Sequence, residues 1–87
     1  MQMVYNIWNA PPLAIYIGRG SEWGNPFVIG VDGDRDEVIY RFTEYMLENL
    51  SKNSKWLEPL KDKDLMCYCA PLACHGDVIK MYLSISK

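Results

Sequence analysis

All three cysteines and the single histidine of this chain lie within one short segment. Cys67, Cys69, Cys74 and His75 fall within nine consecutive positions of an 87-residue sequence, with the spacing C-x-C-x4-C-H. Thiolates and imidazole nitrogens are the ligands that zinc prefers, and a thiol beside a histidine can also act as a nucleophile. The segment therefore predicts a site, which is a metal centre, a reactive thiol or a ligand-binding turn.

A zinc centre would use Cys67, Cys69, Cys74 and His75 as its four ligands. The spacing departs from the paired cysteine knuckles of most zinc modules, and the side chains of adjacent Cys74 and His75 diverge. For Cys67 and Cys69 we favour a packing role, in which small apolar side chains fill a tight contact between a strand and a helix. No cofactor is expected, and zinc is the alternative.

A reactive thiol is the second interpretation of the segment. Cys74 stands at the expected start of a helix, where the helix dipole lowers the pKa of a thiol, and His75 is its neighbour. Asp77 lies in the first helical turn, and Glu22 adds a carboxylate from another loop. The candidate catalytic residues are Cys74, His75, Asp77 and Glu22, but the pattern defines no reaction, so enzymatic activity is left open.

Three strands and two main helices must position these side chains. Dense β-forming residues predict strands at 3–8, 13–17 and 64–69, and prolines end the first and the last of them, the last at Pro71. Both faces of 64–69 are apolar, as in a central strand that is covered on both sides.

Capping signals and helical spacing predict the two helices. Asp34 and Glu37 resemble a capping box for a helix that ends between Ser51 and Ser54. A last helix is expected at 76–85, with its inner face formed by Val78, Ile79, Tyr82 and Leu83. Between these helices, one short turn at 55–60 should carry inward the side chains of Trp56, Leu57 and Leu60.

These elements predict a single domain over residues 1–87, of the α/β or α+β class. The domain should have two or three layers, with about three strands and two main helices. The strand, loop and helix around the cysteine segment are Rossmann-like in their order, although the sheet is too small for a complete Rossmann unit. A chain of this length buries only a modest core.

A second loop, Gly18-Arg19-Gly20, also follows a predicted strand. If the two strands are parallel neighbours, both loops lie on one rim of the sheet, where ligands bind in open α/β folds. Backbone N–H groups at a helix start attract anions, and the guanidinium of Arg19 suits phosphate or carboxylate. The loop 23–27 either caps the core with its aromatic rings or forms a ligand wall. The candidate ligand-binding residues from this reasoning are Gly18, Arg19, Gly20, Trp23, Asn25, His75, Gly76 and Asp77.

These motifs together resemble those of a known small domain family. The stretches Ile15–Gly20, Trp23–Phe27, Cys67–Pro71 and Cys74–Asp77, with Arg35, are similar to a family that is widespread in bacteriophages and bacteria and catalogued as a domain of unknown function. The similarity extends from about Tyr5 to Tyr82. It implies that the glycine-arginine loop, Asn25, Arg35 and the cysteine-histidine segment form one shared site, and that the chain has a phage or mobile-element origin. It implies no settled activity.

The composition narrows the possible partners and the compartment. The net charge of −2 argues against a broad surface for duplex DNA, and no apolar run is long enough for a membrane span. An odd number of cysteines excludes a complete disulfide framework, so a reducing cytoplasm is expected, that of the host cell if a phage encodes the chain. The sequence does not define the oligomeric state.

Three functions follow from these observations. The favoured one is binding of a nucleotide or another phosphorylated small molecule at a pocket formed by the loops 18–20 and 23–27 and by the helix start at 74–77. The second is a zinc-stabilised module that binds nucleic acid or protein. The third is a phage effector that binds a host protein, in which the cysteine segment is only structural.

Overall fold

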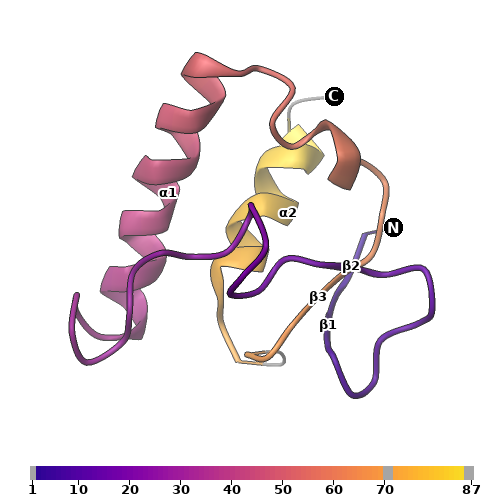
Figure 1. The fold of residues 1–87 in the computed structure, drawn as a ribbon, viewed down its shortest axis with the longest axis horizontal. Helices are drawn as coiled ribbons and strands as arrows, with labels where there is room; N and C mark the ends of the chain where they lie inside the picture. The colour runs from indigo at the N-terminus through magenta and orange to yellow at the C-terminus, as the bar shows by residue number, and fades with distance from the viewer. Residues whose placement is uncertain (1, 70–71, 86–87) are drawn as a thin grey trace.

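A three-stranded parallel sheet and two long helices form the fold (Figure 1). The structure is a computed structural model, and it describes residues 2–69 and 72–85. Pro71, predicted to end a strand, lies outside the described residues. In chain order the elements are β1 (Val4–Asn6), β2 (Ile15–Tyr16), α1 (Arg35–Lys52), a 3-10 turn η1 (Glu58–Leu60), β3 (Leu65–Cys67) and α2 (His75–Ile85).

The sheet has the strand order β1-β3-β2, and β3 pairs in parallel with both neighbours. The prediction that β3 is central is confirmed, and the condition that β2 runs parallel beside it is met. The strands are shorter than predicted, and β1 shows why. The side chain of Asn6 accepts a hydrogen bond from the backbone N–H of Trp8 at 3.1 Å, which closes a turn directly after the strand.

Both helices cover the same face of the sheet. The register aligns Leu65 with Val4 and Ile15, and this row faces the core, where Leu65 is fully buried. The next row, which faces the other side of the sheet, consists of Tyr5, Met66 and Tyr16. All three residues are only half-buried. The prediction that β3 is covered on both sides is therefore wrong, because the two available helices form a single layer.

The helix α1 begins as the sequence predicts. The backbone N–H of Glu37 donates to Asp34 Oδ1 at 2.9 Å, and the N–H of Asp34 donates to Glu37 Oε1 at 3.4 Å, which completes the capping box. The helix ends within the expected segment, at Lys52. Its inner stripe carries the buried side chains of Val38, Phe42 and Met46.

The C-terminal half of the chain closes the core. Leu57 and Leu60, around the 3-10 turn, are buried as predicted, and Trp56 packs against the core. The helix α2 starts at His75, one residue earlier than expected, and buries Ile79 and Leu83. Among the described residues, no helix is long and apolar enough to cross a membrane.

Replacing Leu65 by Ala is expected to lower the free energy of unfolding by about 2–5 kcal/mol, because it leaves a cavity at the centre of the sheet. The matched control is Leu13→Ala, since Leu13 is 88% exposed while Leu65 is 0% exposed. Urea unfolding followed by circular dichroism measures both variants. Equal destabilisation by the two changes would contradict this account of the core.

Candidate functional site

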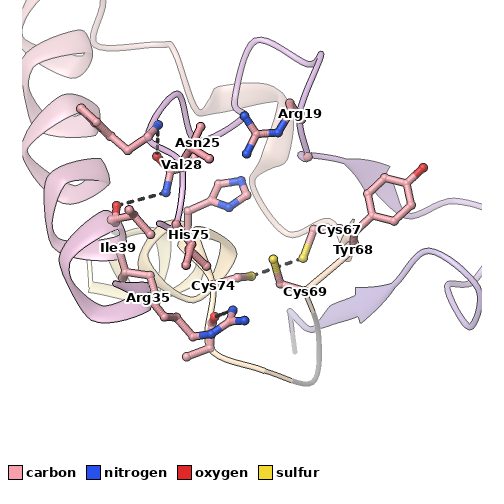
Figure 2. Close-up of a pocket in the computed structure, with 15 residues that line it drawn as sticks. Arg19, Asn25, Val28, Arg35, Ile39, Cys67, Tyr68, Cys69, Cys74 and His75 are labelled. Carbon is pink, nitrogen blue, oxygen red and sulfur yellow. Dashed lines mark hydrogen bonds between the residues drawn. The ribbon is translucent and has the colours of Figure 1, made fainter. Parts of the chain in front are cut away.

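The loops that follow β2 and β3 meet at one rim of the sheet, beside the start of α2. They border a cavity of about 280 Å³, to which the loop before α1 and the first turns of α1 also contribute (Figure 2). This arrangement follows from the parallel pairing of β2 and β3, because the carboxyl ends of parallel strands lie at the same edge. The lining residues are Gly18, Arg19, Asn25, Phe27, Val28, Ile29, Arg35, Val38, Ile39, Cys67, Tyr68, Cys69, Ala73, Cys74 and His75.

His75 connects three elements at the inner end of this cavity. Its Nε2 atom lies 2.8 Å from the carbonyl oxygen of Ile17, the residue that directly follows β2. Its ring meets the ring of Phe42 on α1 edge-on, with 4.9 Å between the ring centroids. Only 6% of His75 is exposed. The residue therefore joins the start of α2 to the end of β2 and to α1.

The same environment keeps the His75 ring neutral. Burial is the main cause that lowers the pKa of His75, and the nearby positive charge of Arg19 adds to it, while backbone hydrogen bonds with Ile17 and Trp23 and the charge of Asp77 oppose it. A carbonyl oxygen can only accept, so Nε2 carries the proton in the neutral ring. Arg19 and His75 both line the cavity; that they bind one ligand stays a prediction.

Cys74 is a protected thiol rather than an activated one. Its Sγ atom lies 3.3 Å from that of Cys67, and both residues are buried. The hydrogen bond with Cys67 raises the pKa of Cys74, and burial raises it further. The prediction of a lowered pKa at the helix start is therefore wrong, because the neighbouring thiol and the buried position outweigh the helix dipole. The packing role predicted for Cys67 is confirmed by its contact with Cys74 at the junction of β3 and α2.

The first turn of α2 uses most of its N–H groups within the protein. Asp77 Oδ2 accepts from the backbone N–H of Cys74 at 3.1 Å, and the N–H of Asp77 donates to the carbonyl of Cys74 at 3.0 Å. A backbone hydrogen bond from Gly76 reaches the Cys74 thiol. Few donors remain at this helix start for an anion, so the charge needed to attract one must come from side chains.

Gly76 has a packing role at this helix start. A Cβ atom on Gly76 would lie 2.8 Å from the side chain of Ile17 and 3.1 Å from that of Val4. Both distances are shorter than ordinary van der Waals contacts, so a side chain at this position would push α2 away from the sheet. The absence of a side chain lets α2 approach β1 and the end of β2.

Arg19 and Arg35 supply that charge from two different elements. Arg19 is exposed in the loop after β2, and Figure 2 shows its guanidinium extending toward Asn25 and His75. Arg35 is the first residue of α1, and its Nη1 donates to the carbonyl of Ala73 at 2.9 Å. The view of Figure 2 places the two arginines on opposite sides of His75. Both positions are consistent with the sequence-based expectation.

Backbone contact holds the loop that carries Arg19. A Cβ atom on Gly24 would lie 2.6 Å from the carbonyl oxygen of Gly18 and 3.3 Å from the Cα atom of Arg19, so only glycine permits this approach. The hydroxyl of Tyr16 donates to the carbonyl of Arg19 at 2.9 Å. The two predicted loops, 18–20 and 23–27, therefore pack directly against each other.

Asn25 and Trp23 brace the second loop. The Nδ2 group of Asn25 donates to the carbonyl of Val38 on α1 at 3.1 Å, and its Oδ1 accepts from the N–H of Phe27 at 2.9 Å. The indole N–H of Trp23 donates to the carbonyl of Trp56 at 2.9 Å, and its ring packs against the core. For Trp23, this is the core-capping alternative that the sequence left open.

The structure brings together most of the predicted site residues. Those that line the cavity are Gly18, Arg19, Asn25, Arg35, Cys67, Cys69, Cys74 and His75. Those that do not line it are Gly20, Glu22, Trp23, Gly76 and Asp77. Glu22 and Asp77 are exposed, and neither carboxylate reaches the cavity. The candidate set for catalysis is thus divided between the cavity and the surface.

Sequence reasoning missed an apolar wall of the cavity. Val28 and Ile29 come from the loop before α1, and Val38 and Ile39 come from the first turns of that helix. Val38 and Ile39 follow the apolar spacing of a helix, a pattern that by itself indicates core packing. Their place in the sequence could have indicated a position at the cavity, because they lie within the first turns of a helix that starts with the candidate residue Arg35.

A zinc centre receives no support from the geometry. Within residues 2–69 and 72–85, no group of three or more histidine, cysteine, aspartate or glutamate side chains is placed so that it could hold a metal ion. The Nε2 atom of His75 is turned toward the carbonyl of Ile17. A tetrahedral site needs four ligands that converge on one point.

Comparison with known proteins agrees with the resemblance seen in the motifs. A family model described as a domain of unknown function (DUF4326) matches residues 3–84. An uncharacterised 12.4 kDa protein from the nrdA-td intergenic region of Enterobacteria phage T4 is 36% identical over 69 residues. That match covers 75% of this chain and 62% of the phage protein. No solved structure matches the chain.

The His75 pKa is expected to lie below about 6.5, its ordinary value, and this can be measured by NMR without ambiguity because the chain has one histidine. The folded state binds this proton less readily than the unfolded state. The stability that the neutral ring contributes is therefore complete above pH of about 6.5 and is lost as the pH falls through the folded pKa.

Urea unfolding at about pH 7.5 and about pH 5.5 tests the same linkage. The wild-type protein should lose stability between these conditions, and His75→Gln, which keeps a side-chain donor, should lose less. A titration midpoint of His75 at or above its ordinary pKa would contradict the proposed tautomer and burial.

Proposed function

The chain belongs to the DUF4326 family, a domain of unknown function, and we propose that it binds a nucleotide or another small phosphorylated molecule in the cavity between the loops 18–20 and 23–29 and the start of α2. The observation that carries the proposal is the charge of the cavity. Two of the three arginines of the chain border it, and among its described lining residues none is an aspartate or glutamate.

The positive charge of the cavity contrasts with the net negative charge of the protein. The chain has 11 acidic residues and a net charge of −2, yet the cavity contains only cationic and neutral groups. Arg19 and Arg35 border the cavity from different elements, so a ligand that enters it meets positive charge at two places. Guanidinium groups form strong, directional pairs with phosphate oxygens, which makes phosphate the best match.

The second wall favours a ligand that has an apolar part as well as an anionic one. This wall is formed by uncharged, apolar side chains, which are those of Phe27, Val28, Ile29, Val38 and Ile39. A nucleotide combines a flat base with a phosphate, so its base would lie against this wall while its phosphate meets the arginines. Inorganic phosphate would use only half of these contacts.

The size of the cavity limits the ligand. Its volume of about 280 Å³ lies near the lower end of the range for small-molecule sites, which is roughly 300–1,000 Å³. We therefore favour a mononucleotide or a sugar phosphate over a dinucleotide. His75 then supports the cavity as a neutral, buried link, and the carboxylates of Glu22 and Asp77 lie outside it, so the proposal is binding and assigns no reaction.

The test is a binding panel of inorganic pyrophosphate, ribose 5-phosphate and mononucleotides, measured by calorimetry and by the thermal unfolding midpoint. We expect Arg19→Gln and Arg35→Gln each to weaken binding of the best member by about 10- to 100-fold, because each removes a charge-assisted hydrogen bond of roughly 1.5–3 kcal/mol. A ligand of the native state must also raise the midpoint.

The matched control is Arg41→Gln, which removes the third arginine of the chain. Arg41 lies over the ring of Phe27, with its Cζ atom 5.9 Å from the ring centroid, and does not line the cavity. Its replacement should leave the affinity within about two-fold of the wild-type value. The proposal is wrong if no panel member binds at millimolar concentration, or if the three arginine variants weaken binding equally.

A further inference from the structure

We infer that Cys67 and Cys74 form a redox-active dithiol, which closes to an intramolecular disulfide when it reacts with a small-molecule disulfide. The two Sγ atoms lie 3.3 Å apart, at the end of β3 and directly before α2. This site is additional to the binding of a phosphorylated ligand, and it does not depend on that proposal.

The geometry of the pair favours bond formation. A disulfide bond is about 2.05 Å long, so the sulfur atoms need to approach by little more than one ångström. Both thiols already point at each other, as the dashed line between them in Figure 2 shows. Cys67 is the last residue of β3 and Cys74 directly precedes α2, so a small shift of the helix start can supply the movement.

The cavity gives the reagent access to the pair. Cys67 is 1% exposed and Cys74 is 4% exposed, so neither is open on the outer surface. Both nevertheless line the cavity, and a small disulfide that enters it meets the two sulfur atoms together. A thiol that is captured there has its partner within reach, which favours closure of the ring over a lasting mixed disulfide.

The exchange has two steps. One thiol of the pair loses its proton, and its sulfur attacks the reagent, which breaks the reagent's S–S bond and forms a mixed disulfide with release of one small thiol. The second protein sulfur then loses its proton and attacks the protein sulfur of the mixed disulfide, which forms the Cys67–Cys74 bond and releases the second small thiol. The protein loses two hydrogen atoms, and the reagent is reduced to two thiols.

Cys69 is the competing thiol and the natural control. It is a free, half-buried cysteine, and it lines the same cavity. The strand direction places it after β3, whereas Cys67 is the last strand residue and contacts Cys74. Oxidation that depends on exposure alone would favour Cys69, while oxidation that depends on proximity favours the pair.

The experiment treats the full chain with bis(2-hydroxyethyl) disulfide at mildly alkaline pH, followed by acid quenching, alkylation in denaturant and peptide mapping by mass spectrometry. The alkaline condition raises the thiolate fraction of the protein's cysteines, and the thiolate is the attacking form. We expect the major product to be lighter than the reduced protein by two hydrogen atoms. Its peptides should contain a disulfide bond between Cys67 and Cys74, which a reductant breaks.

The variant Cys69→Ser should form the same bridge at a similar rate, and Cys67→Ala and Cys74→Ala should not form it. If Cys67→Ala or Cys74→Ala fails to fold, peptide mapping of the wild-type chain and of Cys69→Ser still tests whether the Cys67–Cys74 disulfide forms. The inference is overturned if the main product is a mixed disulfide on Cys69 with Cys67 and Cys74 both alkylated, a bridge that includes Cys69, or a disulfide between two chains.

Discussion

The hydrogen bond between His75 Nε2 and the carbonyl oxygen of Ile17 is the contact on which the cavity depends. Ile17 follows β2, His75 opens α2, and the His75 ring also packs against Phe42 of α1. One buried imidazole therefore fixes the relative positions of three elements. The glycine-arginine loop begins at the next residue, so its start is held where the helix α2 begins.

Because the His75 ring is neutral, it adds no charge to the cavity. A buried histidine cation would lose most of its hydration here, and the charge of Asp77 offsets this cost only in part. Arg19 adds to this by disfavouring a second positive charge nearby. The cationic character of the cavity thus depends on the guanidinium groups of Arg19 and Arg35.

Local sequence signals predicted the frame of the structure well. The capping box of Asp34 and Glu37, the helical stripe that follows it and the central position of β3 each depend on residues that are close in sequence. The meeting of two loops at one rim followed from a general property of parallel strands. Arg19 and His75 were therefore identifiable from the sequence, while Arg35 was identifiable only from the motif resemblance.

The direction in which side chains turn at the strand-helix junction was not predictable. Asp77 folds back onto the N–H of Cys74, and the Cys74 thiol turns toward Cys67, so both side chains have hydrogen-bond partners within the protein. These side-chain orientations depend on the distance between β3 and α2, and packing elsewhere in the core determines that distance. A helix dipole can be inferred from sequence, but the burial and the thiol contact that outweigh it cannot.

The cysteine-histidine motif is best explained as a junction that lets a helix approach a small sheet closely. Cys67 and Cys74 are small, and Gly76 has no side chain where a Cβ atom would meet Ile17 at 2.8 Å. A thiol tolerates burial because it packs like a small apolar group and still forms a weak hydrogen bond. His75 supplies the polar link that the small residues cannot. The same close approach that holds the sheet and the helix together also brings two sulfur atoms to 3.3 Å, so the packing of this junction and its redox chemistry have a single structural cause.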